Sequence, residues 1–179
     1  MTKNNFVYEN SNFLKINKYC NLAHRYSAFY CIAGFAGAGK TFALNQYTKN
    51  NSGTILLTLG KSTSPRDLFN ELLNEFRNES IYRSESKGFL KRLIMDEIDA
   101  YDKKGLIIID ETGQIEGSKL PYIKEIRDMT STKFGLILSA HKDFLSHSIN
   151  WKRKGKVGVE ELISRIYSTV TLKRPTDGE

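Results

Sequence analysis

Apolar residues recur every three or four positions in several parts of this chain, which is the spacing of one face of an α-helix. Phe13, Ile16 and Cys20 follow this spacing. Ser64 and Pro65 form a typical helix start before another such series. We expect helices at about 11–25, 42–50, 65–77, 89–104, 118–129 and 158–166, with a polar loop at 78–86. Basic residues close the 89–104 helix, where the helix dipole favours positive charge.

Short apolar runs separate these helices. Continuous runs predict strands buried on both faces of a sheet, and they lie at 28–33, 54–59, 106–109 and 134–138. A fifth strand is expected at 167–172, where apolar and polar residues alternate. Strands that alternate with helices favour right-handed crossovers and a mainly parallel sheet covered on both faces. The predicted fold class is therefore α/β, as a single domain over 1–179 with its core at about 27–172.

The turn after the first expected strand carries a complete phosphate-binding motif. Residues 34–41 fit the pattern G-x-x-x-x-G-K-[ST], in the strand–loop–helix setting that the motif requires. Its glycines let the backbone wrap a phosphate, and its N–H groups and the helix N-terminus favour negative charge. We expect Lys40 to reach the β- and γ-phosphates of a nucleotide and Thr41 to coordinate Mg²⁺. The expected binding residues are Gly34, Phe35, Ala36, Gly37, Ala38, Gly39, Lys40, Thr41 and Phe42.

An acidic pair, Asp110-Glu111, follows the third expected strand. Open α/β sheets bind their ligands at the carboxyl ends of the strands, which is where this pair lies. We expect Asp110 to hold Mg²⁺, directly or through water, and Glu111 to orient and deprotonate the attacking water. Hydrolysis is therefore expected in addition to binding. The alternative is that both acids cap the next helix.

A third polar group follows the fourth expected strand, which ends in Ser139-Ala140-His141. A side chain here could bond the γ-phosphate or the attacking water, with His141 the first choice and Ser139 the second. The alternative is a strand-end residue that faces solvent. His24 and His147 are interpreted as ordinary surface or helix residues.

Positive charge is concentrated in the last part of the chain. The chain carries 27 Lys and Arg against 20 Asp and Glu, a formal charge of +7, and most of this excess lies within residues 142–174. Trp151 opens a Lys-Arg-Lys-Gly-Lys run, which predicts a flexible basic loop able to contact DNA phosphates without selecting a base sequence. The alternative is a solvated basic loop. The expected DNA contacts are Lys152, Arg153, Lys154 and Lys156.

Arg165 closes the last expected helix, directly before the fifth strand. An arginine in this place could enter the nucleotide site of a neighbouring copy and stabilise the transition state, as arginine fingers do. The alternative is a structural arginine held in a salt bridge.

In their order along the chain, the phosphate loop, Asp110-Glu111, the polar strand end and Ser164-Arg165-Ile166 resemble the motifs of AAA+ ATPases. More narrowly, residues 13–172 resemble the ATPases encoded beside transposases in bacterial mobile elements, typified by the B protein of phage Mu. Segments 32–42 and 154–166 carry this narrower resemblance. It implies ATP-dependent assembly of a homo-oligomer on double-stranded DNA, non-specific DNA binding, and recruitment or stimulation of a transposase, with hydrolysis promoting release.

Two departures from the AAA+ pattern are visible. Only seven residues follow Leu172, so we expect no helical lid with its second sensor arginine in this sequence, and no N-terminal DNA-binding extension like that of many relatives. The chain is therefore either a minimal member of the family or an excised ATPase core. Among other nucleotide-binding classes, a GTPase would need an Asn-Lys-x-Asp-type motif, and an ABC-type ATPase a Leu-Ser-Gly-Gly-type signature; neither is found. A small-molecule kinase fits by size, but Asp110-Glu111 suits water activation better. A helicase-loading ATPase and a nucleotide-gated adaptor with little turnover stay open as alternatives.

The length and composition of the chain exclude some classes of protein. A chain of 179 residues with 40% hydrophobic and 11% aromatic residues is typical of one globular domain. No run approaches the ~18 apolar residues of a membrane span, and the first residues lack the apolar core of a signal peptide, so we expect a cytoplasmic protein without membrane contact. Cys20 and Cys31 lack metal-ligand spacing and are expected to be buried, reduced thiols.

Overall fold

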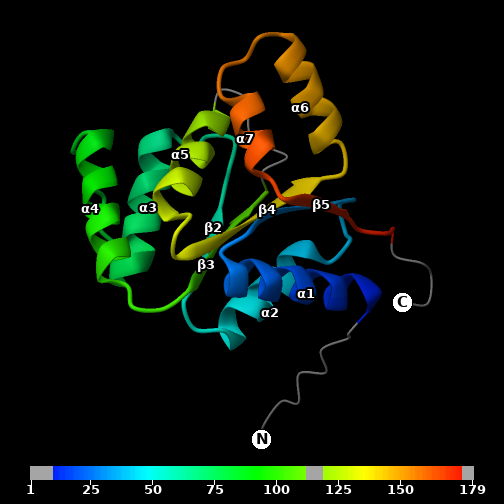
Figure 1. Ribbon diagram of the computed structural model, residues 1–179, viewed down its shortest axis with the longest axis horizontal. Helices are drawn as coiled ribbons and strands as arrows, with labels where there is room; N and C mark the ends of the chain where they lie inside the picture. The colour runs from blue at the N-terminus through cyan, green and yellow to red at the C-terminus, as the bar shows by residue number, and fades with distance from the viewer. Residues whose placement is uncertain (1–9, 112–118, 175–179) are drawn as a thin grey trace, which may run out of the picture.

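The computed structural model describes residues 10–111 and 119–174, and these residues form a five-stranded sheet with helices on both faces (Figure 1). Its order is β2-β3-β4-β1-β5, and every neighbouring pair is parallel. The strands are β1 (Phe29–Gly34), β2 (Thr54–Thr58), β3 (Gly105–Asp110), β4 (Phe134–His141) and β5 (Ser168–Thr171). The predicted α/β class with a parallel sheet is confirmed.

The helices form two layers around this sheet (Figure 1). One face carries α1 (Ser11–Tyr26) and α2 (Lys40–Asn50). The opposite face carries α3 (Pro65–Arg77), α4 (Lys87–Ala100), α5 (Leu120–Thr130) and α7 (Val159–Arg165). The remaining helix, α6 (Phe144–Arg153), packs beside α7. No described helix is long and apolar enough to cross a membrane.

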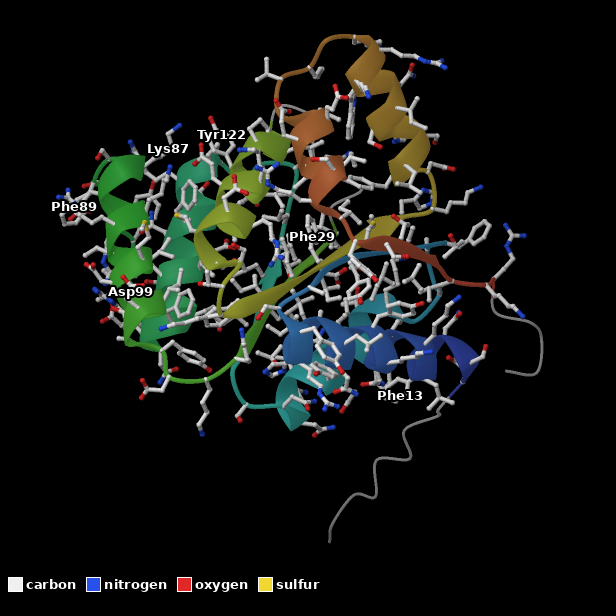
Figure 2. The ribbon with its side chains drawn as sticks, viewed as in Figure 1. Phe13, Phe29, Lys87, Phe89, Asp99 and Tyr122 are labelled. Carbon is white, nitrogen blue, oxygen red and sulfur yellow. The ribbon has the colours of Figure 1, made fainter. Side chains whose placement is uncertain are left out.

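A separate apolar core joins each helical layer to the sheet. Successive side chains of a strand point to opposite faces, so β1 places Phe29 in the core beneath α5 and α7, and Ile32 in the core beneath α1 and α2. Figure 2 shows Phe29 inside the molecule, whereas Lys87 and Tyr122 meet at its surface, with the ammonium 4.7 Å from the ring centre. The helix α1 approaches β4 so closely that a Cβ at Gly135 would collide with the backbone carbonyl of this helix.

The helix α3 begins with the N-terminal cap that the sequence predicts. The hydroxyl of Ser64 accepts a hydrogen bond from the backbone N–H of Asp67, and the Asp67 carboxylate accepts one from the N–H of Ser64 in return. The bonds to Ser64 lower the pKa of Asp67. This reciprocal cap satisfies N–H groups that have no partner within the helix. The helix therefore spans Pro65–Arg77, in agreement with the expected 65–77.

Two expectations about element boundaries and burial are wrong. The helix α4 ends at Ala100 and not near Lys104, because Tyr101 is already extended; Lys104 lies in the following connection and donates to the carbonyl of Thr132. The strand β2 is not buried on both faces, because it lies at the edge of the sheet. The start of the helix expected at 118–129 lies outside the described residues, and α5 continues to Thr130.

The first part of the expected basic loop is helical. Lys152 and Arg153 form the last turn of α6, and Lys154 is its C-cap. The sequence analysis expected no helix here, and α6 buries only Phe144 and Ser148.

Both cysteines are buried and free, as predicted. Burial raises the pKa of Cys20 and of Cys31 to about 12. Neither thiol is therefore ionised at neutral pH.

Candidate active site

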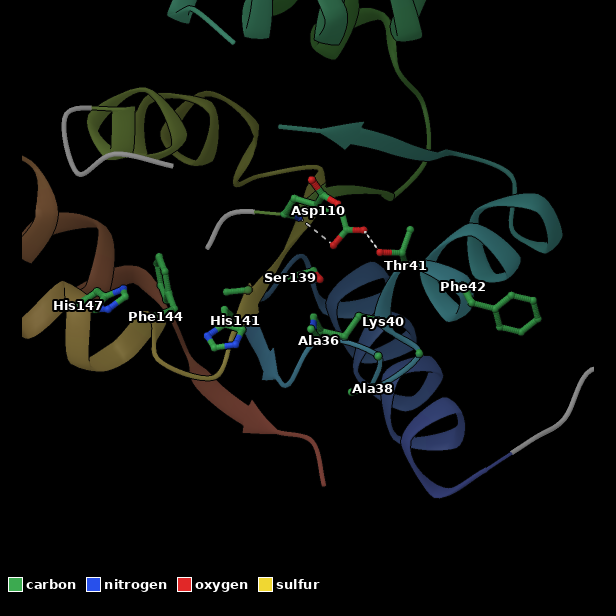
Figure 3. A pocket seen from close by; sticks show the side chains of 14 residues that line it. Ala36, Ala38, Lys40, Thr41, Phe42, Asp110, Ser139, His141, Phe144 and His147 are labelled. Atoms are coloured by element: carbon green, nitrogen blue, oxygen red, sulfur yellow. Dashed lines mark hydrogen bonds between the residues drawn. The ribbon is translucent and has the colours of Figure 1, made fainter. Parts of the chain in front are cut away.

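A cavity of about 540 Å³ opens at the carboxyl ends of β1, β3 and β4 (Figure 3). Its volume lies within the range of small-ligand sites, roughly 300–1,000 Å³. Three separate sequence motifs meet there because parallel strands end at the same edge of the sheet. The lining residues are Ala36, Gly37, Ala38, Gly39, Lys40, Thr41, Phe42, Asp110, Glu111, Ser139, Ala140, His141, Phe144 and His147.

The phosphate loop joins β1 to α2. Gly37 and Gly39 have φ angles of 78° and 80°, a backbone conformation that side chains with a Cβ rarely adopt. Gly39 is also the N-cap of α2, so the unpaired N–H groups of the first helical turn lie beside the cavity. This arrangement is suited to an anion.

Lys40 is held against its own loop. Its ammonium donates hydrogen bonds to the carbonyl oxygens of Gly34 at 3.0 Å and Phe35 at 2.8 Å. Partial burial lowers the pKa of Lys40, and the charge of Asp110 opposes part of this effect. A half-buried cation between glycine-rich backbone and a carboxylate attracts an anionic ligand strongly, because little water screens it.

Asp110 and Thr41 are bonded to each other across the cavity floor (Figure 3). The Thr41 hydroxyl donates to the Asp110 carboxylate at 2.7 Å, and the other carboxylate oxygen accepts the backbone N–H of Glu111 at 2.9 Å. Asp110 is 1% exposed, and Glu111 has a left-handed φ of 62° that is uncommon outside glycine. Among the described residues, the next helix is α5 with Lys119 as its N-cap, so neither acid caps it.

The end of β4 brings both predicted sensor candidates to the cavity. Strand pairing places His141 beside Gly34, at the start of the phosphate loop. Ile109 pairs with Leu138, so Ser139 lies one position further along, level with Asp110. Ser139 is buried, whereas His141 is partly exposed and its Nδ1 lies 3.2 Å from the carboxylate of Asp143.

The wall formed by α6 was missed by the sequence analysis. Phe144 and His147 lie on one face of this helix, three residues apart, and both line the cavity (Figure 3). His147 is an exposed helix residue, as interpreted from the sequence, and the placement of α6 also brings it to the cavity wall. Because α6 itself was not predicted, the position of its side chains beside the phosphate loop was not predicted either.

Some predicted nucleotide contacts lie outside the cavity. Gly34 and Phe35 contribute carbonyl groups to Lys40 but do not line it. Phe42 does line the cavity, but its ring points away from Asp110 in Figure 3 and packs against Phe13, with ring centres 6.3 Å apart. The remaining histidine, His24, lies on α1 beside Tyr47, away from the cavity.

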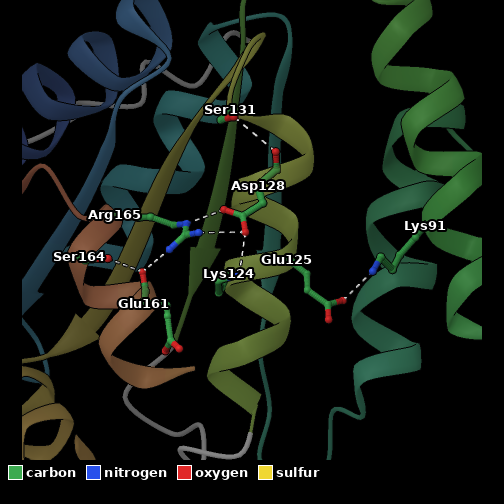
Figure 4. A network of polar contacts seen from close by, with 8 residues as sticks. All are labelled: Lys91, Lys124, Glu125, Asp128, Ser131, Glu161, Ser164 and Arg165. Atoms are coloured by element: carbon green, nitrogen blue, oxygen red, sulfur yellow. Dashed lines mark hydrogen bonds and ion pairs between the residues drawn. The ribbon is translucent and has the colours of Figure 1, made fainter. Parts of the chain in front are cut away.

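Arg165 does not line the cavity of its own chain. It ends α7, and its guanidinium donates to Asp128 on α5 and to the carbonyl of Glu161 (Figure 4). The salt bridge that was its structural alternative is therefore present. The residues predicted to contact DNA also lie away from the cavity, and Lys152 pairs with Glu160 at 2.6 Å.

The donor set fits a magnesium–nucleotide complex. A hydroxyl and a buried carboxylate that already contact each other are hard oxygen ligands of the kind Mg²⁺ prefers. The positive-φ glycines, the helix N-terminus and Lys40 provide N–H donors for phosphate on the same side of the cavity.

A phosphate loop after β1, an acidic pair after β3 and this strand order define a P-loop nucleotide-binding fold. A protein-family model described as an AAA domain matches residues 23–146, which is more than half of the chain. The chain therefore belongs to the AAA domain family. No curated protein sequence is significantly similar to it.

Several solved structures share the fold. ORC1 of Aeropyrum pernix in complex with DNA aligns with a TM-score of 0.69 at 13% identity, over 93% of this chain and 45% of that one. The A. pernix ORC2 protein in its ADPNP–ADP complexes gives 0.65 at 14%, over 96% and 50%. A Walker-type ATPase of Pyrococcus abyssi gives 0.60 at 13%, over 96% and 55%. The chain thus spans about half the length of these proteins, and at such identities the similarity describes the fold alone.

Proposed function

We propose that this protein binds ATP with Mg²⁺ in the cavity and hydrolyses it. The observation that carries the proposal is the convergence of the complete phosphate loop, the Thr41–Asp110 pair and Glu111 at one edge of the sheet. Lys40 and the loop N–H groups bind the phosphates, and Thr41 and Asp110 hold the metal. Bound Mg²⁺ neutralises charge that develops on the phosphates.

Glu111 acts as the general base in this proposal. Its side chain is exposed at the cavity, where it can reach a water molecule, while its backbone is fixed by the bond to Asp110. His141, with Ser139 as the second choice, contacts the γ-phosphate or that water. Arg165 serves a neighbouring copy of the chain, so the active form is a homo-oligomer.

Double-stranded DNA is the proposed macromolecular partner. Among the described residues, Arg153, Lys154 and Lys156 form no ion pair, so their charges are available to phosphates at the α6–α7 turn. The ORC1 structure named above was determined with DNA, which supports a DNA-associated role for this fold. Recruitment or stimulation of a transposase is the finer proposal, carried by the resemblance of segments 32–42 and 154–166 alone.

A replication-initiator or helicase-loader role is the second candidate. The observation that favours it is the fold similarity to the ORC proteins of A. pernix. The two candidates differ in their protein partner, so purification of the tagged chain from its own cells separates them. A transposase in the eluate supports the first candidate, and a replicative helicase supports the second.

Steady-state ATP hydrolysis, with and without double-stranded DNA at low and moderate salt, tests the proposal. We expect magnesium-dependent turnover that DNA stimulates and that salt weakens, because phosphate contacts release counterions. Glu111→Gln should bind ATP and lose at least ~100-fold in turnover. The matched control is Glu79→Gln, an acid in the loop after α3 that is far from the cavity in sequence and fold. Absence of ATP binding by the purified wild-type chain would refute the proposed function.

A further inference from the structure

The guanidinium of Arg165 is held by two helices at once (Figure 4). Its Nε donates to one oxygen of Asp128 at 2.5 Å and its Nη2 donates to the other at 3.3 Å, while Nη1 donates to the carbonyl of Glu161 at 2.7 Å. Two acceptors on α5 and one on α7 thus fix both the position and the plane of the group. A planar guanidinium with a bidentate carboxylate has little freedom to rotate.

This arrangement leaves part of the guanidinium available. An arginine has five N–H donors, and the three bonds above leave one on each terminal nitrogen. The side chain of Arg165 is 34% exposed, so these two donors can reach an acceptor outside the subunit. A pair of donors on adjacent nitrogens suits the oxygens of a phosphate.

Asp128 is itself held in place from two directions. Lys124, one turn earlier on α5, donates to its carboxylate at 2.9 Å. The preceding residue, Arg127, anchors α5 to the sheet through the carbonyls of Phe134 at 3.0 Å and Ser27 at 2.9 Å. The carboxylate therefore provides a fixed support for Arg165. Both partners are partly exposed, so this network fixes Arg165 at a surface that another molecule can reach.

We propose that Asp128 is a positioning residue for catalysis in trans: it orients Arg165 so that the two remaining donors meet the γ-phosphate in the site of a neighbouring copy. This inference rests on the proposed ATPase function and on the proposed role of Arg165. In this proposal Asp128 acts through Arg165 and does not itself contact the nucleotide or the attacking water. Because Asp128 already restricts the side chain of Arg165, little side-chain freedom is lost when the transition state forms.

ATP turnover by mixed subunits tests this inference. Arg165→Ala subunits keep Glu111, and Glu111→Gln subunits keep Arg165, so each preparation alone should be inactive and the mixture should regain turnover. We expect mixtures containing the double variant Glu111→Gln/Asp128→Ala in place of Glu111→Gln to regain about 10- to 100-fold less turnover. Equal recovery by the two mixtures would overturn the positioning role.

The matched control is Glu125→Ala, which removes an acid from the same helix that pairs with Lys91 and not with Arg165. Introduced into the Glu111→Gln subunit, it should leave the recovery unchanged. Within one chain, Asp128→Ala should lower kcat with little change in KM, Asp128→Asn should lower it less, and Asp128→Ala/Arg165→Ala should be no worse than Arg165→Ala. Losses that multiply in the double variant would show that Asp128 acts independently of Arg165.

The proposed function, the role of Arg165 and the role of Asp128 would each be contradicted by a different experimental result. A wild-type chain that does not bind or hydrolyse ATP contradicts the proposed function. An Arg165→Ala variant with wild-type turnover contradicts the role of Arg165, and the present inference with it. An inactive Arg165→Ala variant beside a fully active Asp128→Ala variant overturns the present inference alone. Circular dichroism and thermal unfolding of each variant identify any loss that comes from misfolding.

Discussion

The edge of the sheet that carries the phosphate loop and the face formed by α5 and α7 are built in opposite ways. At the sheet edge, the polar groups are positioned by the backbone of the strand ends and the phosphate loop. Asp110 there is 1% exposed and hydrogen-bonded to Thr41 and to the backbone of Glu111. On the α5–α7 face, long side chains meet between two helices, and Arg165 and Asp128 are 34% and 39% exposed. The first arrangement is complete within one chain, whereas the second leaves donors for another molecule.

This difference indicates what each region can do alone. Groups bonded within a half-buried cavity can bind a nucleotide in an isolated subunit, because the donors are already oriented and little water screens them. An exposed ion pair gains little from water-screened attraction, so its contribution depends on a second surface. We therefore expect substitutions in the phosphate loop at the sheet edge to alter binding even in an isolated subunit, and those on the α5–α7 face to alter only turnover that needs assembly.

The largest effect is expected from Lys40→Ala. This change removes the ammonium from the phosphate loop, and hydrogen bonds from a charged donor are worth about 1.5–3 kcal/mol each. ATP affinity should fall by at least ~100-fold in calorimetric titration, even at protein concentrations too low for assembly. Lys49→Ala, at the exposed end of the same helix, is the control and should bind ATP normally. Normal affinity of Lys40→Ala would remove the distinction between the two regions.

A smaller loss, in stability and not in binding, is expected from Leu162→Ala. Leu162 lies on α7 and its side chain is fully buried, so truncation should lower the free energy of unfolding by about 2–5 kcal/mol in urea denaturation. Val157→Ala, at an 82% exposed position before the same helix, should change it by less than about 0.5 kcal/mol. Nucleotide affinity of the folded Leu162→Ala protein should be unaltered, since this residue does not line the cavity.

The smallest expected effect is a change in tryptophan fluorescence when ATP binds. Trp151 is the chain's single tryptophan, and its ring centre lies 6.4 Å from Phe144 and 6.1 Å from His147, both of which line the cavity. ATP binding should therefore change the intensity of tryptophan fluorescence modestly, and the change should saturate with the calorimetric affinity. The Lys40→Ala variant should show no change. An unaltered spectrum of ATP-saturated wild-type protein would mean that α6 does not respond to the ligand.

The sequence identified most of the sheet edge because its signals are local. The phosphate motif, the apolar run before Asp110-Glu111 and the polar end of β4 each specify a strand and the residues that follow it. Parallel strands then bring these ends together whatever connects them. The capped start of α3 was predictable for the same reason, since Ser64 and Asp67 satisfy each other within four residues.

Other features depended on contacts between distant residues. Strand order made β2 an edge strand and exposed one of its faces, although its sequence resembles that of a buried strand. The packing of α6 placed Phe144 and His147 at the cavity wall, a position that depends on how this helix lies against the rest of the fold.

What the sequence alone determined was the α/β class and which polar residues follow the strands at the sheet edge, because hydrophobic period and backbone motifs act over a few residues. What the tertiary structure decided was which side chains face each other across elements. Arg165 and Asp128 are 37 positions apart in the chain, and only the packing of α7 against α5 brings them into contact. No local pattern encodes such a pair, because its geometry depends on how two helices lie against the same sheet.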